Sequence, residues 1–97
     1  MNNITIIELL NKLSKENLNI IDIRNNYNYQ LGHIPTATNI NKILLKSNPE
    51  DYLEKSKTYY IYCESGHTSI NVVNTLNKLG YNTVNITGGY HNYLLSK

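Results

Sequence analysis

The stretch from Thr58 to Ile86 constrains the fold most, because strand-like and helix-like patterns alternate within it. Thr58–Tyr62 is a run of strand-forming residues, and Thr83–Ile86 is a second one. A helix is expected between them. Its apolar face consists of Ile70, Val73, Leu76 and Leu79, and Gly80 marks its end. This order predicts a βαβ unit with parallel strands, a right-handed crossover and a ligand site beyond the carboxyl ends of the strands.

The rest of the chain continues the alternation. A capping-box pattern at Thr5-Ile6-Ile7-Glu8 opens a helix whose apolar face is Ile6, Leu9, Leu10 and Leu13. Leu18–Ile23 predicts a buried strand, and a short strand is expected around Asn39-Ile40. Asn48 and Pro49 predict the start of a further helix that ends near Lys55. We therefore expect an α/β protein.

Composition limits the class of protein. A chain of 97 residues is expected to form one domain. Its formal charge is only +2 and Arg24 is its only arginine, so we expect that it does not bind nucleic acid. No apolar run is long enough to cross a membrane, so no membrane partner is expected. One cysteine and no recognisable leader predict a soluble protein of the reducing cytoplasm. The sequence specifies no oligomeric state.

Cys63, the only cysteine, is the candidate nucleophile. It follows the predicted strand Thr58–Tyr62 and precedes a short polar loop and a helix. Gly66 allows a tight turn, so several consecutive N–H groups are expected to converge on the sulfur and stabilise a thiolate. The alternative is an inert, buried thiol that packs as a small apolar group. A place at the functional edge of the sheet favours the nucleophile.

Two further loops are expected at the same edge. Asp22 and Arg24 end the strand Leu18–Ile23, and Gly88-Gly89 follows the strand that ends at Ile86. In a parallel sheet the carboxyl ends of the strands share one edge. We therefore expect these loops to meet the Cys63 loop.

Three motifs extend over nearly the whole chain. They are Ile21-Asp22-Ile23-Arg24 with Gly32-His33-Ile34-Pro35, the loop from Cys63 to Ser69, and Leu79-Gly80-Tyr81 with Gly88-Gly89-Tyr90. Together they resemble the motifs of the rhodanese-like sulfurtransferase family. The first is similar to the family's D-x-R strand end and G-H-I-P-G segment, with Thr36 in place of the usual second glycine. The second resembles its active-site loop C-x-x-G-x-[RTS]-S, and the third its closing motif, with Tyr93 where tryptophan is usual.

The resemblance implies a fold and an activity. The expected fold is a three-layer α/β/α arrangement around a central, mainly parallel sheet of about five strands, with residues 1–97 as a single domain. The expected activity is ping-pong sulfur transfer, in which Cys63 takes sulfur from thiosulfate, 3-mercaptopyruvate or a persulfide. It then passes this sulfur to cyanide, a thiol or a protein cysteine. The chemistry needs no metal or other cofactor.

The remaining candidate residues are assigned to two groups. The first surrounds the persulfide, mainly through backbone N–H groups, and consists of Glu64, Ser65, Gly66, His67, Thr68 and Ser69. Glu64 points to solvent or toward the site, where its charge would repel thiosulfate; His67 faces solvent or assists Cys63. The second group braces the edge of the site and consists of Asp22, Arg24 and His33.

Three alternatives compete with this interpretation. Cysteine-dependent phosphatases use a C-x5-R loop, but Ser69 occupies the sixth position after Cys63. A metal site of Cys63, His33 and His67 matches no paired zinc spacing. A rhodanese-like module that binds a partner or senses redox state or persulfide without turnover also fits the motifs, although the presence of Cys63 favours sulfur chemistry.

Overall fold

Within residues 2–97, five strands form one parallel sheet in the order β1-β5-β4-β2-β3. The computed structural model describes residues 2–97. The strands are β1 (Asn3–Ile4), β2 (Asn19–Asp22), β3 (Thr38–Asn39), β4 (Thr58–Tyr62) and β5 (Asn82–Ile86). The predicted central parallel sheet of about five strands is therefore confirmed.

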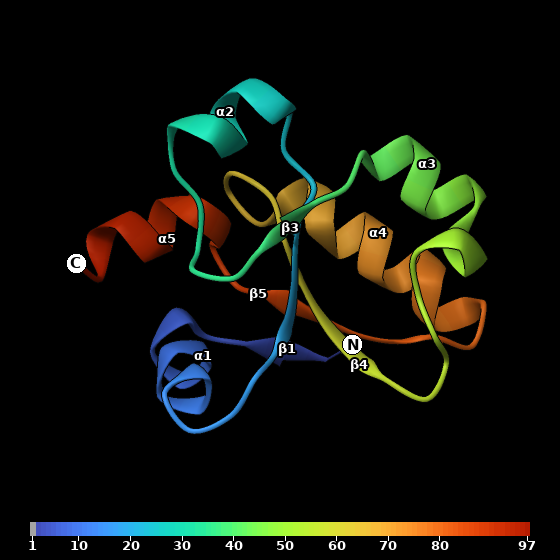
Figure 1. Ribbon diagram of the computed structural model, residues 1–97, viewed down its shortest axis with the longest axis horizontal. Coiled ribbons are helices and arrows are strands. Elements are labelled where there is room, and N and C mark those ends of the chain that lie inside the picture. Colours follow the sequence, from blue (N-terminus) through green and yellow to red (C-terminus); the bar gives the residue numbers. More distant parts are fainter. Residues whose placement is uncertain (1) are drawn as a thin grey trace.

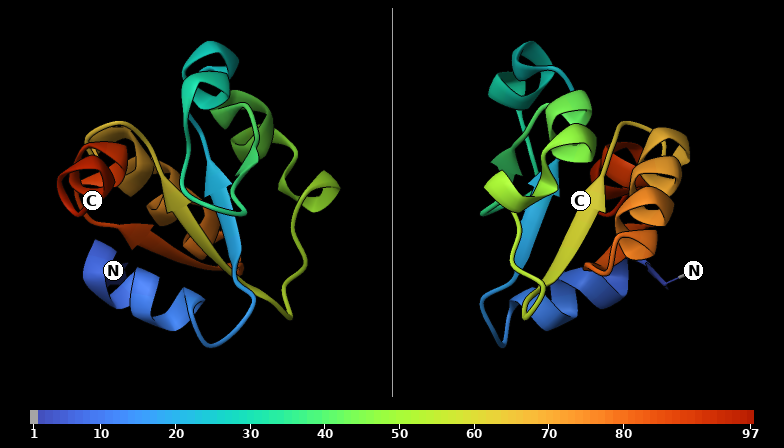
Figure 2. Two further views of the ribbon diagram at one scale, coloured as in Figure 1. Left: turned by 60° about the vertical axis from the view of Figure 1, so that its left-hand side comes forward. Right: turned by 90° about the vertical axis from the view of Figure 1, so that its right-hand side faces the viewer.

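Helices cover both faces of this sheet. They are α1 (Ile6–Leu13), α2 (Asn26–Leu31), α3 (Lys42–Ser47), α4 (His67–Lys78) and α5 (Gly89–Leu95), with one 3-10 turn, η1 (Pro49–Asp51). Helices α1 and α5 lie on one side of the sheet, and α3 and α4 lie on the other (Figure 1). The arrows of β2 and β4 point the same way, toward the end of the molecule that carries α2 (Figure 2). That end is the carboxyl edge where the site was expected.

The alternation of side chains along β4 supplies both cores. Tyr59 and Ile61 join the apolar cluster beneath α3 and α4, whereas Tyr60 and Tyr62 join the cluster beneath α1 and α5. Successive side chains of a strand point to opposite faces, so a strand buried on both faces is apolar throughout. This explains why β4 reads as a continuous run of strand formers.

Most predicted elements are confirmed to within one or two residues. The capping box is present, with the Glu8 N–H donating to Thr5 Oγ1 and the Thr5 N–H donating to Glu8 Oε1. The buried face of α4 differs from the predicted one, because it consists of Ser69, Val72, Val73 and Leu76. Leu79 is 48% exposed at the end of the helix.

The predicted helix from Asn48 to Lys55 is wrong. The chain forms only the 3-10 turn η1 there, and the Asn48 side chain caps nothing. The regular helix is α3, which comes before it and which the Asn41 side chain caps by accepting from the Ile43 and Leu44 N–H groups. Leu45 of α3 is fully buried, so packing favours the helix at this earlier position.

Besides α3, three elements were not predicted: β1, α2 and α5. β1 has only two residues, α2 has no buried residue, and α5 begins with the glycine pair. Each therefore lacks the apolar periodicity or the helix propensity that reveals an element in a sequence.

Thr36 adopts φ +71°, a region that favours glycine. It stands where the related motif has its second glycine, so the backbone of this turn keeps the glycine conformation although the residue has changed.

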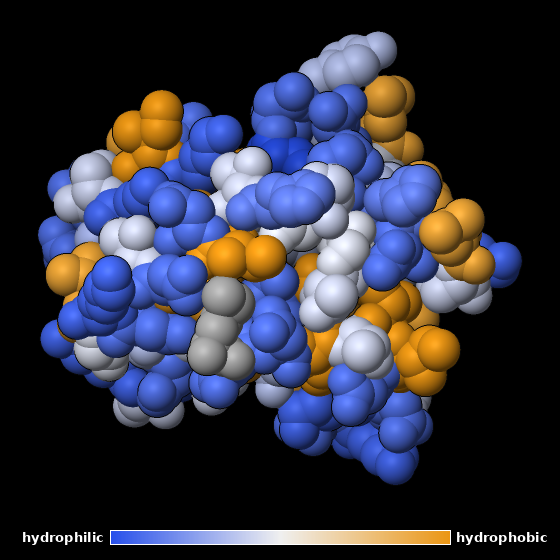
Figure 3. Space-filling view, turned by 180° about the vertical axis from the view of Figure 1, so that it is seen from behind, coloured by the Kyte–Doolittle hydropathy of each residue, from blue (hydrophilic) through white to orange (hydrophobic). Residues whose placement is uncertain are grey.

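One face of the molecule is largely polar. The face opposite that of Figure 1 is mostly hydrophilic, and its hydrophobic areas are separate from one another (Figure 3). No helix within residues 2–97 is long and apolar enough to cross a membrane.

Candidate active site

The Cys63 sulfur lies at the bottom of the loop between β4 and α4. Its residue is only 5% exposed, and the sulfur receives the N–H groups of Gly66 at 3.1 Å and Ser69 at 3.3 Å. Gly66 has φ +96°, and a Cβ atom there would come within 2.9 Å of the Gly88 nitrogen. Glycine is therefore required both by the turn and by the neighbouring loop.

The loop favours the thiolate. Burial raises the pKa of the Cys63 thiol, but the Ser69 hydroxyl and the N–H groups of Ser69, Gly66 and Ser65 lower it, and the pKa lies below its ordinary value. Hydrogen bonds to the charged form outweigh desolvation here. At neutral pH a larger fraction of Cys63 is therefore present as the nucleophilic thiolate than for a free cysteine.

Ser69 connects the sulfur to a buried polar network. Its Oγ lies 3.4 Å from Cys63 Sγ and donates to Asn85 Oδ1 at 2.6 Å. Asn85, on β5, is 2% exposed, and its Nδ2 donates to Asn3 Oδ1 at 3.2 Å. Sequence reasoning missed Asn85, although an asparagine between the apolar residues Val84 and Ile86 of a predicted buried strand was a signal for it.

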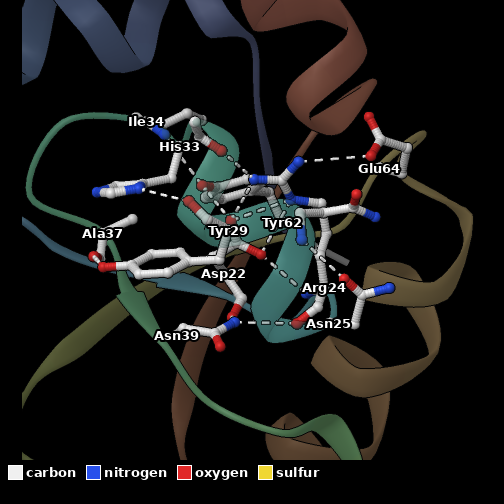
Figure 4. Close-up of polar contacts among 12 residues, drawn as sticks. Asp22, Arg24, Asn25, Tyr29, His33, Ile34, Ala37, Asn39, Tyr62 and Glu64 are labelled. Carbon is white, nitrogen blue, oxygen red and sulfur yellow. Dashed lines mark hydrogen bonds and ion pairs between the residues drawn. The ribbon is translucent and has the colours of Figure 1, made fainter.

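Asp22 and Arg24 form a buried ion pair at the end of β2 (Figure 4). Arg24 Nη2 lies 2.8 Å from Asp22 Oδ2, and Asp22 is fully buried. The Tyr62 hydroxyl donates to the same Oδ2 at 2.6 Å, and the Ile34 N–H donates to that hydroxyl at 3.0 Å. The ion pair therefore joins β2, β4 and the Gly32–Pro35 segment. Tyr62 was not among the predicted site residues.

Arg24 also reaches the Cys63 loop. Its Nη1 lies 3.4 Å from Glu64 Oε1, its Nη2 donates to the Gly32 carbonyl at 2.6 Å, and its guanidinium lies over the Tyr90 ring at 4.0 Å. The Glu64 side chain is 57% exposed but lines the pocket over Cys63. Glu64 thus stands at the mouth of the site with its charge offset by Arg24.

The two predicted histidines lie away from the sulfur. His67 is exposed at the start of α4, with its Nδ1 3.1 Å from Ser65 Oγ. The His33 ring stacks on Tyr29 at 3.9 Å between centroids, and its Nδ1 lies 2.9 Å from the Tyr29 carbonyl oxygen. His33 thus fastens the end of α2, as Figure 4 shows.

The glycine pair brings the third loop to the site. The Tyr90 N–H donates to the Cys63 carbonyl at 2.9 Å, and the His91 N–H donates to the Glu64 carbonyl at 3.0 Å. A Cβ atom on Gly89 would overlap the Cys63 carbonyl oxygen. The loops after β2, β4 and β5 therefore meet at one edge.

A pocket of about 370 Å³ opens over the sulfur. It lies between the Cys63 loop, the segment after β2 and the start of α3. Its lining consists of Ile23, Arg24, Asn25, Asn28, Asn41, Lys42, Ile43, Cys63, Glu64 and Thr68. Lys42 and the three asparagines were not predicted, because they come from segments whose placement beside Cys63 depends on the fold.

Comparison with known proteins identifies similar chains. The family model described as "Rhodanese-like domain" matches residues 5–96. A Bacillus subtilis (strain 168) protein named "Putative sulfurtransferase YtwF" is 38% identical over 74 residues, which are 76% of this chain and 71% of that protein. The tRNA uridine(34) hydroxylase of Acholeplasma laidlawii (strain PG-8A) is 32% identical over 99 residues, covering 94% of this chain but only 30% of that protein.

A solved structure agrees with the fold. The crystal structure of a rhodanese-like domain protein from Staphylococcus aureus superposes with a TM-score of 0.88 at 35% identity. The superposition covers 96% of this chain and 91% of that one.

Proposed function

The chain belongs to the rhodanese-like domain family, and from that premise we propose that it is a sulfurtransferase with Cys63 as nucleophile and persulfide carrier. The observation that carries the proposal is the Cys63 sulfur itself, held by two N–H groups beneath an open pocket. A relative named as a sulfurtransferase supports the same role.

In the first half-reaction the Cys63 thiolate attacks the outer sulfur of a donor. A new S–S bond forms at Cys63, and the bond from the transferred sulfur to the rest of the donor breaks. The leaving group takes that electron pair, as sulfite from thiosulfate or as a thiolate from a persulfide. From 3-mercaptopyruvate a C–S bond breaks, and the carbon takes the pair and a proton to give pyruvate.

In the second half-reaction an acceptor attacks the outer sulfur of the Cys63 persulfide. Cyanide becomes thiocyanate, and a thiolate becomes a new persulfide, while the electron pair of the broken S–S bond returns to Cys63. The N–H groups that lie on Cys63 stabilise the returning negative charge. No electron acceptor or metal enters this balance.

We assign the remaining residues by what they contact. The loop from Glu64 to Ser69 surrounds the persulfide, with Gly66 and Ser69 as its donors to sulfur. Asp22 and Arg24 brace the edge and reach Glu64. His33 positions α2. The His67 ring lies beside Ser65 Oγ, and we assign it an auxiliary role.

Two other activities receive less support. A phosphatase loop would place an arginine at position 69, whereas the residue there is a serine whose hydroxyl lies beneath the sulfur. The hydroxylation named for the Acholeplasma relative is not proposed here, because this chain spans only 30% of that protein.

The test is the intact mass of the protein after brief incubation with thiosulfate, 3-mercaptopyruvate or a low-molecular-weight persulfide. We expect a gain of one sulfur atom that cyanide then removes. Cys63→Ala abolishes the gain if Cys63 is the carrier, and Asn74→Ala, an exposed change on α4 outside the pocket lining, should retain it.

A different result would change the function. If no donor adds sulfur to the folded protein, the chain is better explained as a binding or redox-sensing module without turnover. A gain of sulfur that cyanide cannot remove would indicate a persulfide sensor instead of a transferase.

A further inference from the structure

A positively charged side chain from outside the Cys63 loop lines the pocket over Cys63. Lys42, the first residue of α3, lines the pocket together with Cys63. Within residues 2–97 its ammonium has no carboxylate partner, whereas Arg24, the other cation of the lining, is held by Asp22 and Glu64. Lys42 is therefore the positive charge available to a ligand.

Two asparagine side chains add neutral donors to this lining. Asn25 Oδ1 accepts from the Asn28 N–H, and Asn41 Oδ1 accepts from two N–H groups of α3. Since their oxygens are used in these caps, each side chain presents its Nδ2 group as a donor. An ammonium and two amide donors match the oxygen atoms of a carboxylate or a sulfonate.

The size and charge of the pocket permit such a ligand. Its volume of about 370 Å³ exceeds what a single sulfur atom needs; one liquid water occupies about 30 Å³. Glu64, the acidic side chain of the lining, lies 3.4 Å from Arg24 Nη1. Its repulsion of an anion is therefore partly offset.

We propose that Lys42, with Asn25 and Asn41, binds the carboxylate or sulfonate of an anionic sulfur donor while the transferable sulfur faces Cys63. The inference rests on the proposed sulfur transfer and deepens it by naming the substrate class. Such a site would favour donors whose acid group is remote from the reacting sulfur, such as organic persulfides with a carboxylate.

The test compares two persulfides that differ in one carboxylate, those of 3-mercaptopropionate and of 2-mercaptoethanol. Their rate constants for loading Cys63 are measured by intact mass in the wild type, Lys42→Gln and Lys42→Glu. Lys46→Gln is the matched control, because Lys46 lies one turn further along α3, bonds Asn71 Oδ1 at 2.7 Å and does not line the pocket.

We expect Lys42→Gln to slow loading from the carboxylated persulfide by about threefold, as for a charged hydrogen bond made by an exposed side chain. Loading from the persulfide of 2-mercaptoethanol, which has no carboxylate, should stay at the wild-type rate, and Lys42→Glu should favour that donor. Added salt should slow the carboxylated donor in the wild type more than in Lys42→Gln.

The outcomes separate this inference from the proposed function. Equal slowing with both donors, or no slowing with either, would refute the anion site while leaving sulfur transfer in place. Failure of every donor to load the wild type would refute the proposed transfer, and the anion site with it.

Discussion

Ser69 has one hydroxyl proton and three acceptors within reach. Asn85 Oδ1 lies 2.6 Å from its oxygen, the Gly66 carbonyl 3.3 Å and the Cys63 sulfur 3.4 Å. With a neutral thiol the shortest contact takes the proton. When Cys63 ionises, the hydroxyl gains from turning toward the negative sulfur. The thiol pKa therefore depends on this competition.

Ser69→Ala should raise the pKa of Cys63, because the thiolate loses a hydroxyl donor while the Ser69 N–H remains. The measurement is the rate of alkylation by iodoacetamide against pH, whose inflection should move to higher pH. Asn74→Ala, an exposed change on α4 outside the pocket lining, should leave the inflection in place. An unchanged inflection in Ser69→Ala would show that the backbone N–H groups alone set the pKa.

Asn85→Val tests the same competition, but it should lower the pKa of Cys63 instead of raising it. Removing the acceptor frees the Ser69 proton for the sulfur, so the inflection should move to lower pH. In the double variant with Ser69→Ala, the Asn85 change should have no further effect. Equal shifts from Asn85→Val with and without Ser69 would mean that Asn85 acts only through packing.

Thr36 is a β-branched residue in the left-handed region, at φ +71° and exposed. Such a conformation costs about 1–3 kcal/mol in a residue with a branched side chain. Thr36→Gly should therefore raise the free energy of unfolding by about 1 kcal/mol, measured by urea denaturation. Thr36→Ala keeps a Cβ atom and should recover much less. Destabilisation by glycine would show that the Thr36 side chain itself holds the turn.

At the scale of elements, the site depends on how closely the loops after β4 and β5 approach. Gly66 and Gly80 have nearly the same positive φ, +96° and +95°, but different surroundings. A Cβ on Gly66 would lie 2.9 Å from the Gly88 nitrogen, whereas one on Gly80 would meet only the flexible Lys55 side chain at 3.4 Å. Comparing substitutions at these two glycines therefore distinguishes the effect of backbone strain from the effect of contact between the loops.

Both Gly66→Ala and Gly80→Ala should lose about 1–2 kcal/mol of stability from the left-handed backbone. Gly66→Ala should lose more, because the two loops must also move apart, and it should slow the alkylation of Cys63. Denaturation and alkylation rates check both effects. Equal losses of stability and equal alkylation rates would mean that the loops can separate freely.

At the scale of the molecule, two apolar clusters share one sheet. Leu9 belongs to the cluster beneath α1 and α5, and Leu45 to the cluster beneath α3 and α4; both are fully buried. Strand β4 contributes alternate side chains to the two clusters. Neither cluster can therefore unfold while the other still holds β4 in the sheet. We infer that the described residues unfold as one cooperative unit.

Leu9→Ala and Leu45→Ala should each cost about 2–5 kcal/mol, the usual range for a buried leucine. In both variants, denaturation followed by far-UV circular dichroism and by tyrosine fluorescence should give one coincident midpoint. Ile7→Ala, at 77% exposure on the same helix as Leu9, is the control and should change little. Separate midpoints for the two signals would show that the clusters unfold independently.

The sequence by itself determined the elements whose signals are local. Strand β4 and helix α4 follow from their residue patterns, α1 from its capping box, and Cys63 from its position between strand and helix. The parallel arrangement follows as well, because a helix between two strands returns the chain to the starting end of the sheet, so that the second strand runs in the same direction as the first. Elements without an apolar face, such as α2, gave no such signal.

The tertiary structure alone decided which distant residues complete the site. Lys42 reaches the pocket because α3 packs on α4, and Asn85 reaches Ser69 because β5 pairs with β4. Arg24 meets Glu64 because β2 lies on the other side of β4. Local patterns reveal how a segment folds, but charge and hydrogen bonding at a site depend on the packing of segments that lie far apart in the chain.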